Sequence, residues 1–302
     1  MANSFLKPTQ IAAAALALLQ REIVLPRLVT RYGVADFMGA KDDTLTLRVP
    51  AIKAARTRAL RATSALTADE LAETSVDVTL STHVYSLVGI TDAQLTLDIK
   101  DFAAQVLAPQ VRGIVEEYEN QVATALSDAR PQQASQQITF NTSTGDAYDL
   151  AVDARKVLND LNVPREGRFF VVGSAVEAAF LKCDKLSKVN ESGSSSALRD
   201  AVIGNVAGFT VVGSNAIAES AAYAGHRSAV AFANVAPVVP DGATYGKSMS
   251  FEGLAMTWLR DYDPTYASDR SLVHGFVGAS SVDDGTGDTN KRIVKVNDLT
   301  SA

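Results

Sequence analysis

Two stretches that flank a long polar segment alternate between apolar and polar residues, which is the period of a half-buried strand. The apolar positions are Leu45, Leu47 and Val49 before the segment and Val76, Val78 and Leu80 after it. If the two stretches pair as strands, the residues between them form a long projecting arm. The same alternation at Leu95, Leu97 and Ile99 predicts a further strand.

Helical spacing marks the residues before and after this arm. Residues 8–22 place apolar side chains on one helical face, and Pro26 ends the pattern. Residues 100–129 predict the longest helix of the chain, with apolar residues three or four positions apart. Because proline has no amide hydrogen, this helix either breaks or kinks at Pro109 or restarts with Pro109 in its first turn. The polar run 132–137 predicts a hinge between two parts.

The remainder of the chain mixes helices and strands, which predicts an α+β fold. The predicted elements are helices at 146–161 and 174–182, strands at 168–172, 208–213, 230–235, 249–260 and 272–277, a polar loop at 187–196 and a turn at 261–269. Ser174 is the predicted N-cap of its helix. Because an α/β segment is followed by a return to strands, the order predicts two interleaved domains.

The charges of the arm are sorted into a basic section followed by an acidic section. They are Arg48, Lys53, Arg56, Arg58 and Arg61, then Asp69, Glu70, Glu73 and Asp77. An arm with so few apolar residues cannot bury a core of its own, so its predicted partner is a neighbouring copy of the same surface. These nine residues are the predicted subunit interface. The alternative is a solvated, flexible loop whose charges keep it soluble.

Composition narrows the functional classes. The chain has 302 residues, 47% of them hydrophobic and 21% charged, which is typical of a globular protein with an ample core. A net charge of −6 argues against a protein that coats nucleic acid, although local contact with DNA stays open. Cys183 is the only cysteine, which excludes an intrachain disulfide and a thiolate metal cluster. The apolar run 11–19 has neither the basic flank nor the cleavage site of a signal peptide, so a soluble, cytosolic chain with no membrane partner is predicted.

Motifs for catalysis or for cofactor binding are not found. The three histidines are scattered, at His83, His226 and His274, and none has a metal-ligand spacing. There is no glycine-rich phosphate loop, and the residues around Ser174 do not complete a nucleophile elbow. The carboxylates Asp283, Asp284 and Asp288 do not have the spacing of a calcium-binding loop, so a polar turn is the better interpretation. No catalytic residue, cofactor or metal site is predicted.

The order of these elements resembles that of the major capsid proteins of tailed bacteriophages, which have the Johnson fold. Five segments carry the resemblance, closest to capsid proteins from phages of actinobacteria. They begin at Asn3 (Asn-Ser-Phe-Leu-Lys-Pro), Asp101 (Asp-Phe-Ala-Ala-Gln-Val-Leu-Ala-Pro-Gln-Val), Val163 (Val-Pro-Arg-Glu-Gly-Arg-Phe-Phe-Val-Val), Gly204 (Gly-Asn-Val-Ala-Gly-Phe-Thr-Val-Val-Gly-Ser-Asn) and Arg260 (Arg-Asp-Tyr-Asp-Pro), the last with Asp269. Their order along nearly the entire chain makes the match specific.

The resemblance implies a division of the chain into named parts. Residues 1–36 are expected to form an N-arm and residues 37–91 an extended loop. Residues 92–135, which hold the long spine helix, and residues 236–302 are expected to form a peripheral domain, and residues 136–235 an axial domain. The charged arm falls within the expected extended loop, which in related shells lies across an adjacent subunit.

The resemblance also implies partners and a location. Copies of the chain are expected to associate into hexamers and pentamers, with a portal protein and in some shells a decoration protein, around double-stranded DNA bound without sequence specificity. Because the N-arm begins at residue 1, a separate scaffolding protein is expected and cleavage of this chain is not required. The expected location is the virion capsid, assembled in the host cytoplasm.

The sequence therefore predicts a structural protein, a major capsid protein that assembles into an icosahedral shell, and not an enzyme. The first alternative is a nanocompartment shell protein of the same fold, which encloses an enzyme cargo in place of a genome. The second alternative is an α/β enzyme, which an activity screen distinguishes from a shell protein.

Overall fold

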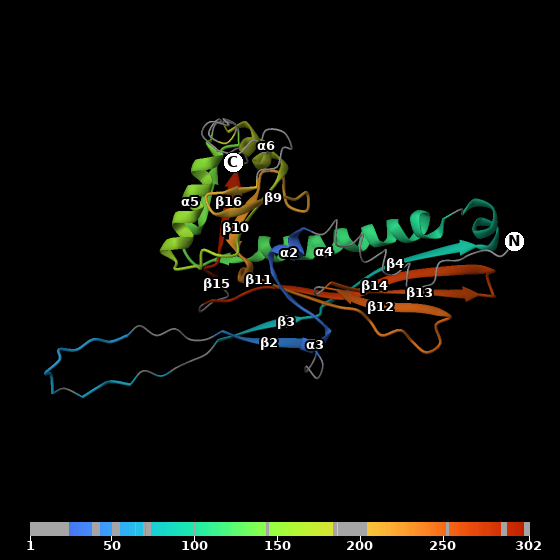
Figure 1. Cartoon of the computed structure of the whole chain (residues 1–302), viewed down its shortest axis with the longest axis horizontal. Coiled ribbons are helices and arrows are strands. Elements are labelled where there is room, and N and C mark those ends of the chain that lie inside the picture. Colours follow the sequence, from blue (N-terminus) through green and yellow to red (C-terminus); the bar gives the residue numbers. More distant parts are fainter. Residues whose placement is uncertain are drawn as a thin grey trace.

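The computed structural model describes residues 24–37, 43–49, 55–63, 65–68, 70, 74–99, 101–142, 145–183, 186, 204–251, 254–284 and 289–298. The predicted helix at 8–22 and the predicted loop at 187–196 lie outside these residues. The molecule is elongated: a long sheet lies beside a long helix, a second sheet with its own helices sits at one end, and a loop projects from that end (Figure 1).

The first sheet has six strands, in the order β1-β11-β14-β13-β12 with β4 paired to the free edge of β14. The strands are β1 (Thr30–Tyr32), β4 (Thr82–Thr91), β11 (Val230–Val235), β12 (Tyr245–Phe251), β13 (Leu254–Asp263) and β14 (Ser268–Ser281). β1 is parallel to β11, and the other neighbours are antiparallel. β14 is long enough to pair with β13 and β11 in succession along one edge, so it is the centre of the sheet.

Helix α4 (Ala108–Asp128) lies along one face of this sheet (Figure 1). Its apolar residues recur every three or four positions and are buried, at Val111, Ile114, Val115, Tyr118 and Val122. The Tyr118 hydroxyl donates to the Ala255 carbonyl at 3.0 Å, and burial raises the pKa of Tyr118. A Cβ atom at position 275 would lie 2.2 Å from that hydroxyl, so only glycine lets the helix approach β14 this closely.

Pro109 lies in the first turn of α4, which agrees with the predicted restart of the helix. A π-helical turn, η3 (Ala103–Leu107), precedes α4, and the Ala108 amide donates to the Ala103 carbonyl. Proline has no amide hydrogen, so position 109 donates no backbone hydrogen bond in the first turn of α4. The wider π turn connects the two helical segments without a break.

The second sheet also has six strands, in the order β6-β16-β10-β7-β9-β8. The strands are β6 (Gln137–Phe140), β7 (Arg168–Val172), β8 (Asn205–Val206), β9 (Phe209–Gly213), β10 (Ala222–His226) and β16 (Ile293–Asp298). Helices α5 (Ala147–Asp160) and α6 (Ser174–Lys182) share a second hydrophobic core with it. Asp146 caps α5 through the Tyr148 amide and also accepts from the buried Cys183 thiol, which packs as a small hydrophobic residue.

Short elements complete the described chain. They are α2 (Leu25–Leu28), α3 (Val34–Phe37), the 3₁₀ helices η4 (Ala134–Gln136) and η5 (Arg227–Ala229), and the two-stranded pair of β5 (Arg130–Pro131) with β15 (Thr289–Asn290). Among the described helices, none is long and apolar enough to cross a membrane.

Two predicted strands are wrong. Residues 95–98 fall in a π-helical turn, η2 (Gln94–Asp98), and Ile99 follows it, because the Thr91 amide donates to the Gln94 side chain while the Gln94 amide donates to the Thr91 hydroxyl. These two reciprocal hydrogen bonds start a helical turn. They outweigh the short alternation of apolar and polar residues that predicted a strand. The strand predicted at 249–260 is instead the end of β12 and most of β13, which pair from Phe251 and Leu254 outward. The change of chain direction between β12 and β13 cannot be read from the pattern, because the apolar residues of both strands face the same core.

Two further predictions change in detail. Ser174 begins α6 but does not cap it; the cap is Gly173, where a Cβ atom would lie 2.2 Å from the Ala218 carbonyl oxygen. The polar run predicted as a hinge is a fixed junction. The side chain of Gln136 is buried there and donates to the carbonyls of Asn290 at 2.9 Å and Ile293 at 2.6 Å.

Strand pairing also cuts across the expected division of the chain. β1 of the expected N-arm, β4 of the expected extended loop and β11 of the expected axial part all pair within the first sheet. β16 of the expected peripheral part pairs with β6 and β10 in the second sheet. Sheet membership depends on which backbone edges meet in space, and a division by sequence order cannot show that.

Candidate assembly surfaces

The projecting arm grows out of a two-stranded ribbon. β2 (Thr44–Val49) and β3 (Thr74–Thr79) are antiparallel, with Leu45 opposite Val78 and Leu47 opposite Val76. The predicted pairing of these two stretches is therefore confirmed. The described residues between the two strands, within 55–70, lie far out from the body of the molecule (Figure 1).

One face of β3 anchors the arm to the body. Val76 and Val78 are buried against Ala231, Ala233 and Val282, in a third, small hydrophobic core. The backbone of β3 also passes directly over β14, since a Cβ atom at position 278 would lie 2.0 Å from the Thr79 carbonyl oxygen. The base of the arm is thus held by packing as well as by strand pairing.

Beyond this base the described part of the arm is on the surface. Residues 55–61, 63, 65–68 and 70 are exposed, and Ala62 is half-buried. A turn forms where the Ala62 amide donates to the Ala59 carbonyl at 3.0 Å, and Leu60 in this turn is 99% exposed. Leu66 is 79% exposed. Burying one leucine side chain contributes about 1.5–3 kcal/mol of favourable free energy. Burial of Leu60 and Leu66 against another surface would therefore stabilise that contact.

The nine predicted interface residues separate into three groups. Arg56, Arg58, Arg61 and Glu70 lie on the exposed, projecting part. Asp77 is exposed on β3 in register with Thr46, and Arg48 of β2 is in register with Ser75. Lys53, Asp69 and Glu73 lie outside the described residues. The register therefore does not set Arg48 opposite Asp77 within one copy.

A second surface is the outward side of α4, which carries acidic residues. Glu119 accepts hydrogen bonds from the amides of Val24 at 2.9 Å and Leu25 at 3.4 Å, so it caps α2. Glu116 is 66% exposed and contacts Arg112 at 3.4 Å, an exposed pair one helical turn apart. Such a pair contributes little, about 0–1 kcal/mol, and leaves Glu116 able to contact another group.

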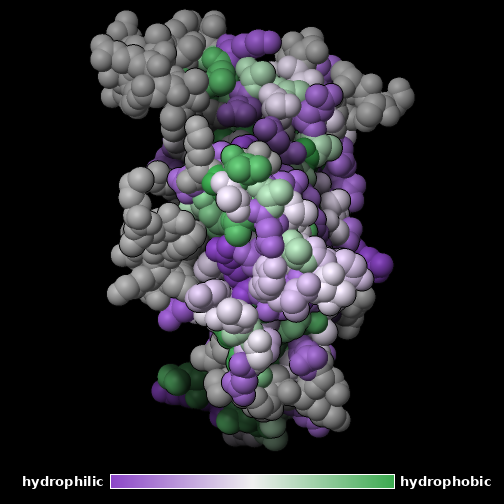
Figure 2. Space-filling view, turned by 90° about the vertical axis from the view of Figure 1, so that its right-hand side faces the viewer, coloured by the Kyte–Doolittle hydropathy of each residue, from purple (hydrophilic) through white to green (hydrophobic). Residues whose placement is uncertain are grey.

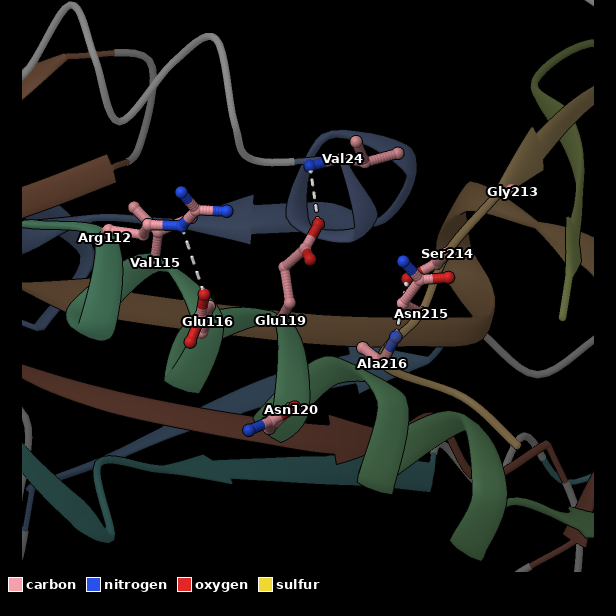
Figure 3. A pocket seen from close by; sticks show the side chains of 10 residues that line it. All are labelled: Val24, Arg112, Val115, Glu116, Glu119, Asn120, Gly213, Ser214, Asn215 and Ala216. Carbon is pink, nitrogen blue, oxygen red and sulfur yellow. Dashed lines mark hydrogen bonds and ion pairs between the residues drawn. The ribbon is translucent and has the colours of Figure 1, made fainter. Parts of the chain in front are cut away.

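These acidic residues border an open hollow of about 500 Å³. α4 forms one wall, Val24 another, and the loop after β9 the third, as Figure 3 shows. The lining residues are Val24, Arg112, Val115, Glu116, Glu119, Asn120, Gly213, Ser214, Asn215 and Ala216. The hollow combines apolar side chains with two carboxylates on its α4 side.

A third surface is the face of the first sheet that is turned away from α4. The register of β4 and β14 brings together two histidines 191 residues apart, with His83 Nε2 3.0 Å from His274 Nδ1. Tyr85 and Phe276 lie beside them, 65% and 36% exposed. Burial, then the neighbouring His83, lowers the pKa of His274. Sequence spacing gave no sign of this pair, because only strand register creates it.

The end of the molecule formed by η2 and the β13–β14 hairpin carries a small hydrophobic patch among hydrophilic residues (Figure 2). The exposed apolar and aromatic side chains of these elements are Leu97, Tyr262 and Tyr266. No cluster of metal-ligating side chains occurs among the residues that the structure describes.

Comparison with known proteins identifies the family. The family model for phage capsid protein matches residues 73–275. No curated protein matches the sequence. A structure from Mycobacterium phage Che8 has a TM-score of 0.65 with 22% identity and covers 91% of both chains. The capsid of cyanophage P-SCSP1u has a TM-score of 0.65 with 10% identity, covering 92% of this chain and 88% of the other. The mature capsid of bacteriophage PhiM1 has a TM-score of 0.62 with 11% identity, covering 92% and 87%.

The fold and the function predicted from the sequence are both confirmed. The solved structures share the mixed helix and sheet architecture across nine tenths of this chain, which is the Johnson fold of phage capsids. Because the family model matches more than half of the sequence, the chain belongs to the phage capsid protein family and is a major capsid protein that forms the shell of a phage.

Proposed function

We propose that copies of this chain close into an icosahedral shell around double-stranded DNA, with each arm lying on a neighbouring copy. The observation that carries the proposal is the arm itself, which extends from an anchored base and exposes Leu60 and Leu66 in a chain of the capsid family. An element that makes its contacts only with another copy explains why those leucines are left on the surface.

The energetics favour many weak contacts repeated at every subunit. One exposed ion pair contributes about 0–1 kcal/mol, and one buried leucine contributes about 1.5–3 kcal/mol. Each copy in a closed shell makes and receives the same contacts. The small free energies of these contacts therefore add up over the shell, and no single strong interaction is needed. We assign the nine charged residues of the arm, from Arg48 to Asp77, to this interface.

We also assign the named parts of the capsid fold by sheet membership. The first sheet with α4 is the peripheral domain and includes β4, β11 and β1. The second sheet with α5 and α6 is the axial domain and includes β16. The extended loop then begins within residues 37–43 and ends before β4, at Thr82.

Further partners follow from the family resemblance. They are hexamers and pentamers of this chain, a scaffolding protein, a portal protein and, in some shells, a decoration protein, with assembly in the host cytoplasm. The inner wall carries no sequence-specific site for DNA in this proposal, which agrees with the acidic net charge of −6. The role is structural and requires no catalysis.

The test is assembly of the purified chain, alone and with the candidate scaffolding protein, followed by sedimentation and electron microscopy. A uniform population of closed particles is expected. A compact monomer across a wide concentration range, with scaffold supplied, would contradict the proposal. Particles filled with an enzyme in place of DNA during infection would instead favour a nanocompartment.

A further inference from the structure

Two segments of the chain cross between the sheets and lie against each other, at a place that we call the seam. One is residues 226–230, which lead from β10 through η5 into β11, and the other is the described part of residues 282–293, between β14 and β16 (Figure 1). We propose that the side chains of His226, Ser228 and Arg292 hold this seam closed at neutral pH, and that protonation of His226 opens it while the two sheets stay folded.

Hydrogen bonds join the two segments directly. The His226 amide donates to the Arg292 carbonyl at 3.0 Å, and the Val282 amide donates to the Ala229 carbonyl at 2.9 Å. The side-chain amide of Asn290 donates to the same Ala229 carbonyl at 2.7 Å. A change at His226 therefore acts where the two crossing segments meet.

The contacts of the His226 ring determine which of its nitrogens carries hydrogen. The Ser228 backbone amide, which can only donate, faces His226 Nδ1 at 3.3 Å, so this nitrogen is an acceptor and the neutral ring carries its hydrogen on Nε2. The Ser228 hydroxyl lies 2.7 Å from the same nitrogen and donates to it, while it accepts from Arg292 Nη1 at 2.9 Å. A neutral His226 thus completes a chain of hydrogen bonds from one segment to the other.

Protonation of His226 disrupts this chain. The added proton would occupy Nδ1, so a ring N–H would face the N–H of the Ser228 backbone. The serine hydroxyl can rotate to accept from the ring, but the backbone amide loses its acceptor unless the chain itself moves. Because Ser228 belongs to η5, which leads directly into β11, the segment that has to move is the crossing itself.

The charges around His226 act in the same direction. Arg168 on β7, Arg227 on η5 and Arg292 on the opposite segment all disfavour a positive charge on the ring. Asp284 accepts from Arg292 Nε at 2.8 Å and offsets that charge. The buried Arg168 instead donates to two backbone carbonyls and to an amide oxygen, which are neutral. A protonated His226 therefore adds a further positive charge to a place where the existing ones are only partly offset.

These contacts set the pH range over which the seam opens. Burial lowers the pKa of His226, a hydrogen bond with the backbone of Glu166 opposes this effect, and Arg227, Arg292 and Arg168 lower the pKa further. In an open seam the ring is hydrated and returns toward the ordinary histidine pKa of about 6.5. The seam is therefore closed most firmly above about pH 6.5, and below it the equilibrium constant for opening rises by up to about tenfold per pH unit, the limit for one proton.

Hydrogen exchange of the unassembled chain, followed by mass spectrometry between about pH 7.5 and pH 5.5, tests the proposal. After correction for the pH dependence of chemical exchange, opening at residues 226–230 is expected to increase by up to about tenfold per pH unit below about pH 6.5. Peptides from α5, which contains no histidine, are the internal reference and are expected to show no such increase. A parallel change in the two regions overturns the proposal.

His226→Asn is the informative variant. The asparagine carbonyl oxygen can take the place of Nδ1 as acceptor for the Ser228 amide, but the side chain does not titrate. The variant is expected to keep the seam protected at neutral pH and to remove the dependence of its opening on pH. His83→Asn, the same substitution at an exposed histidine outside the seam, is the matched control and is expected to keep the parental pH dependence. If His226→Asn also keeps it, His226 does not control the seam.

A second measurement does not require a variant that folds. Proton–nitrogen NMR spectra of the parent chain distinguish the two neutral tautomers and follow the protonation of each histidine ring. His226 is expected to carry its hydrogen on Nε2 and to titrate below about pH 6.5. A neutral ring with its hydrogen on Nδ1, or titration at or above that pH, overturns the proposal. Both measurements use the unassembled chain, so their outcome is independent of whether shells form.

Discussion

At the residue scale, close backbone approach explains the glycine at position 278. A Cβ atom there would lie 2.0 Å from the Thr79 carbonyl oxygen, which belongs to the base of the arm. Gly278→Ala is therefore expected to push β3 away from β14 and to cost about 1–3 kcal/mol in the free energy of unfolding. Gly89→Ala is the control, since nothing lies within 4 Å of the added methyl group. Chemical denaturation measures both, and equal stabilities would contradict the explanation.

Two buried histidines predict how stability depends on pH. Burial lowers the pKa of His226, with Arg227, Arg292 and Arg168 adding to the effect, and burial together with His83 lowers the pKa of His274. In the unfolded chain a histidine has a pKa of about 6.5, so the unfolded state binds protons first as the pH falls. Stability is therefore complete above about pH 6.5 and decreases as the pH falls below it toward the folded-state pKa values.

The measurement is the free energy of unfolding between about pH 7.5 and pH 5. His274→Leu is expected to make the decrease shallower, because one of the two contributing groups is removed. The reverse result, a steeper decrease in the variant, would show that His274 is not one of the groups responsible. Because His83 also lowers the pKa of His274, a substitution at His83 is expected to change the decrease in the same direction and by less.

At the element scale, Pro109 sets the start of α4. The π-helical turn Ala103–Leu107 and the proline together define where the α-helical register of the spine begins. Pro109→Ala restores an amide donor and allows the α register to extend backward through the turn. Altered particle size or curvature is expected, with little loss of monomer stability. Normal particles in the electron microscope, at normal yield, would remove this role for the proline.

The basic section of the arm acts as a set in the proposed interface. Replacing Arg56, Arg58 and Arg61 by glutamate is expected to block or deform assembly while the circular dichroism of the monomer stays the same. Because exposed ion pairs are screened by salt, high ionic strength is expected to weaken parent shells in the same direction. Should the triple variant assemble as well as the parent at low salt, the arm is only a solvated loop.

At the scale of the whole molecule, folding and assembly use different residues. The cores of the two sheets and of the arm base contain no described residue between 50 and 73. Val49 and Thr74 are the last pair of the ribbon, so an Asn-Gly turn in place of residues 50–73 closes a short hairpin. This deletion is expected to leave the thermal unfolding temperature of the monomer nearly unchanged and to abolish shells in electron micrographs. Closed particles from the deletion variant would contradict it.

The sequence alone determined those features that depend on local chemistry. The strands of the arm, the helix restart at Pro109, the helix α5 and the buried strand β7 follow from the periodicity and identity of neighbouring residues. The capsid family also followed from the sequence, because the order of several weak segments is specific even when each segment is not.

Only the tertiary structure decided which distant residues meet. The pairing of β16 with β6 and β10, the contact of His83 with His274, and the hollow between α4, Val24 and the Gly213–Ala216 loop all depend on strand register and on the path of the chain. The turn at Gln94 is different, because Thr91 and Gln94 are only three positions apart and their reciprocal hydrogen bonds are local, although the alternation of leucines concealed them. Local propensity acts over a few residues, whereas register and packing are decided by the burial of whole faces. The sequence therefore predicted the arm, and only the fold brought together the residues that line the hollow.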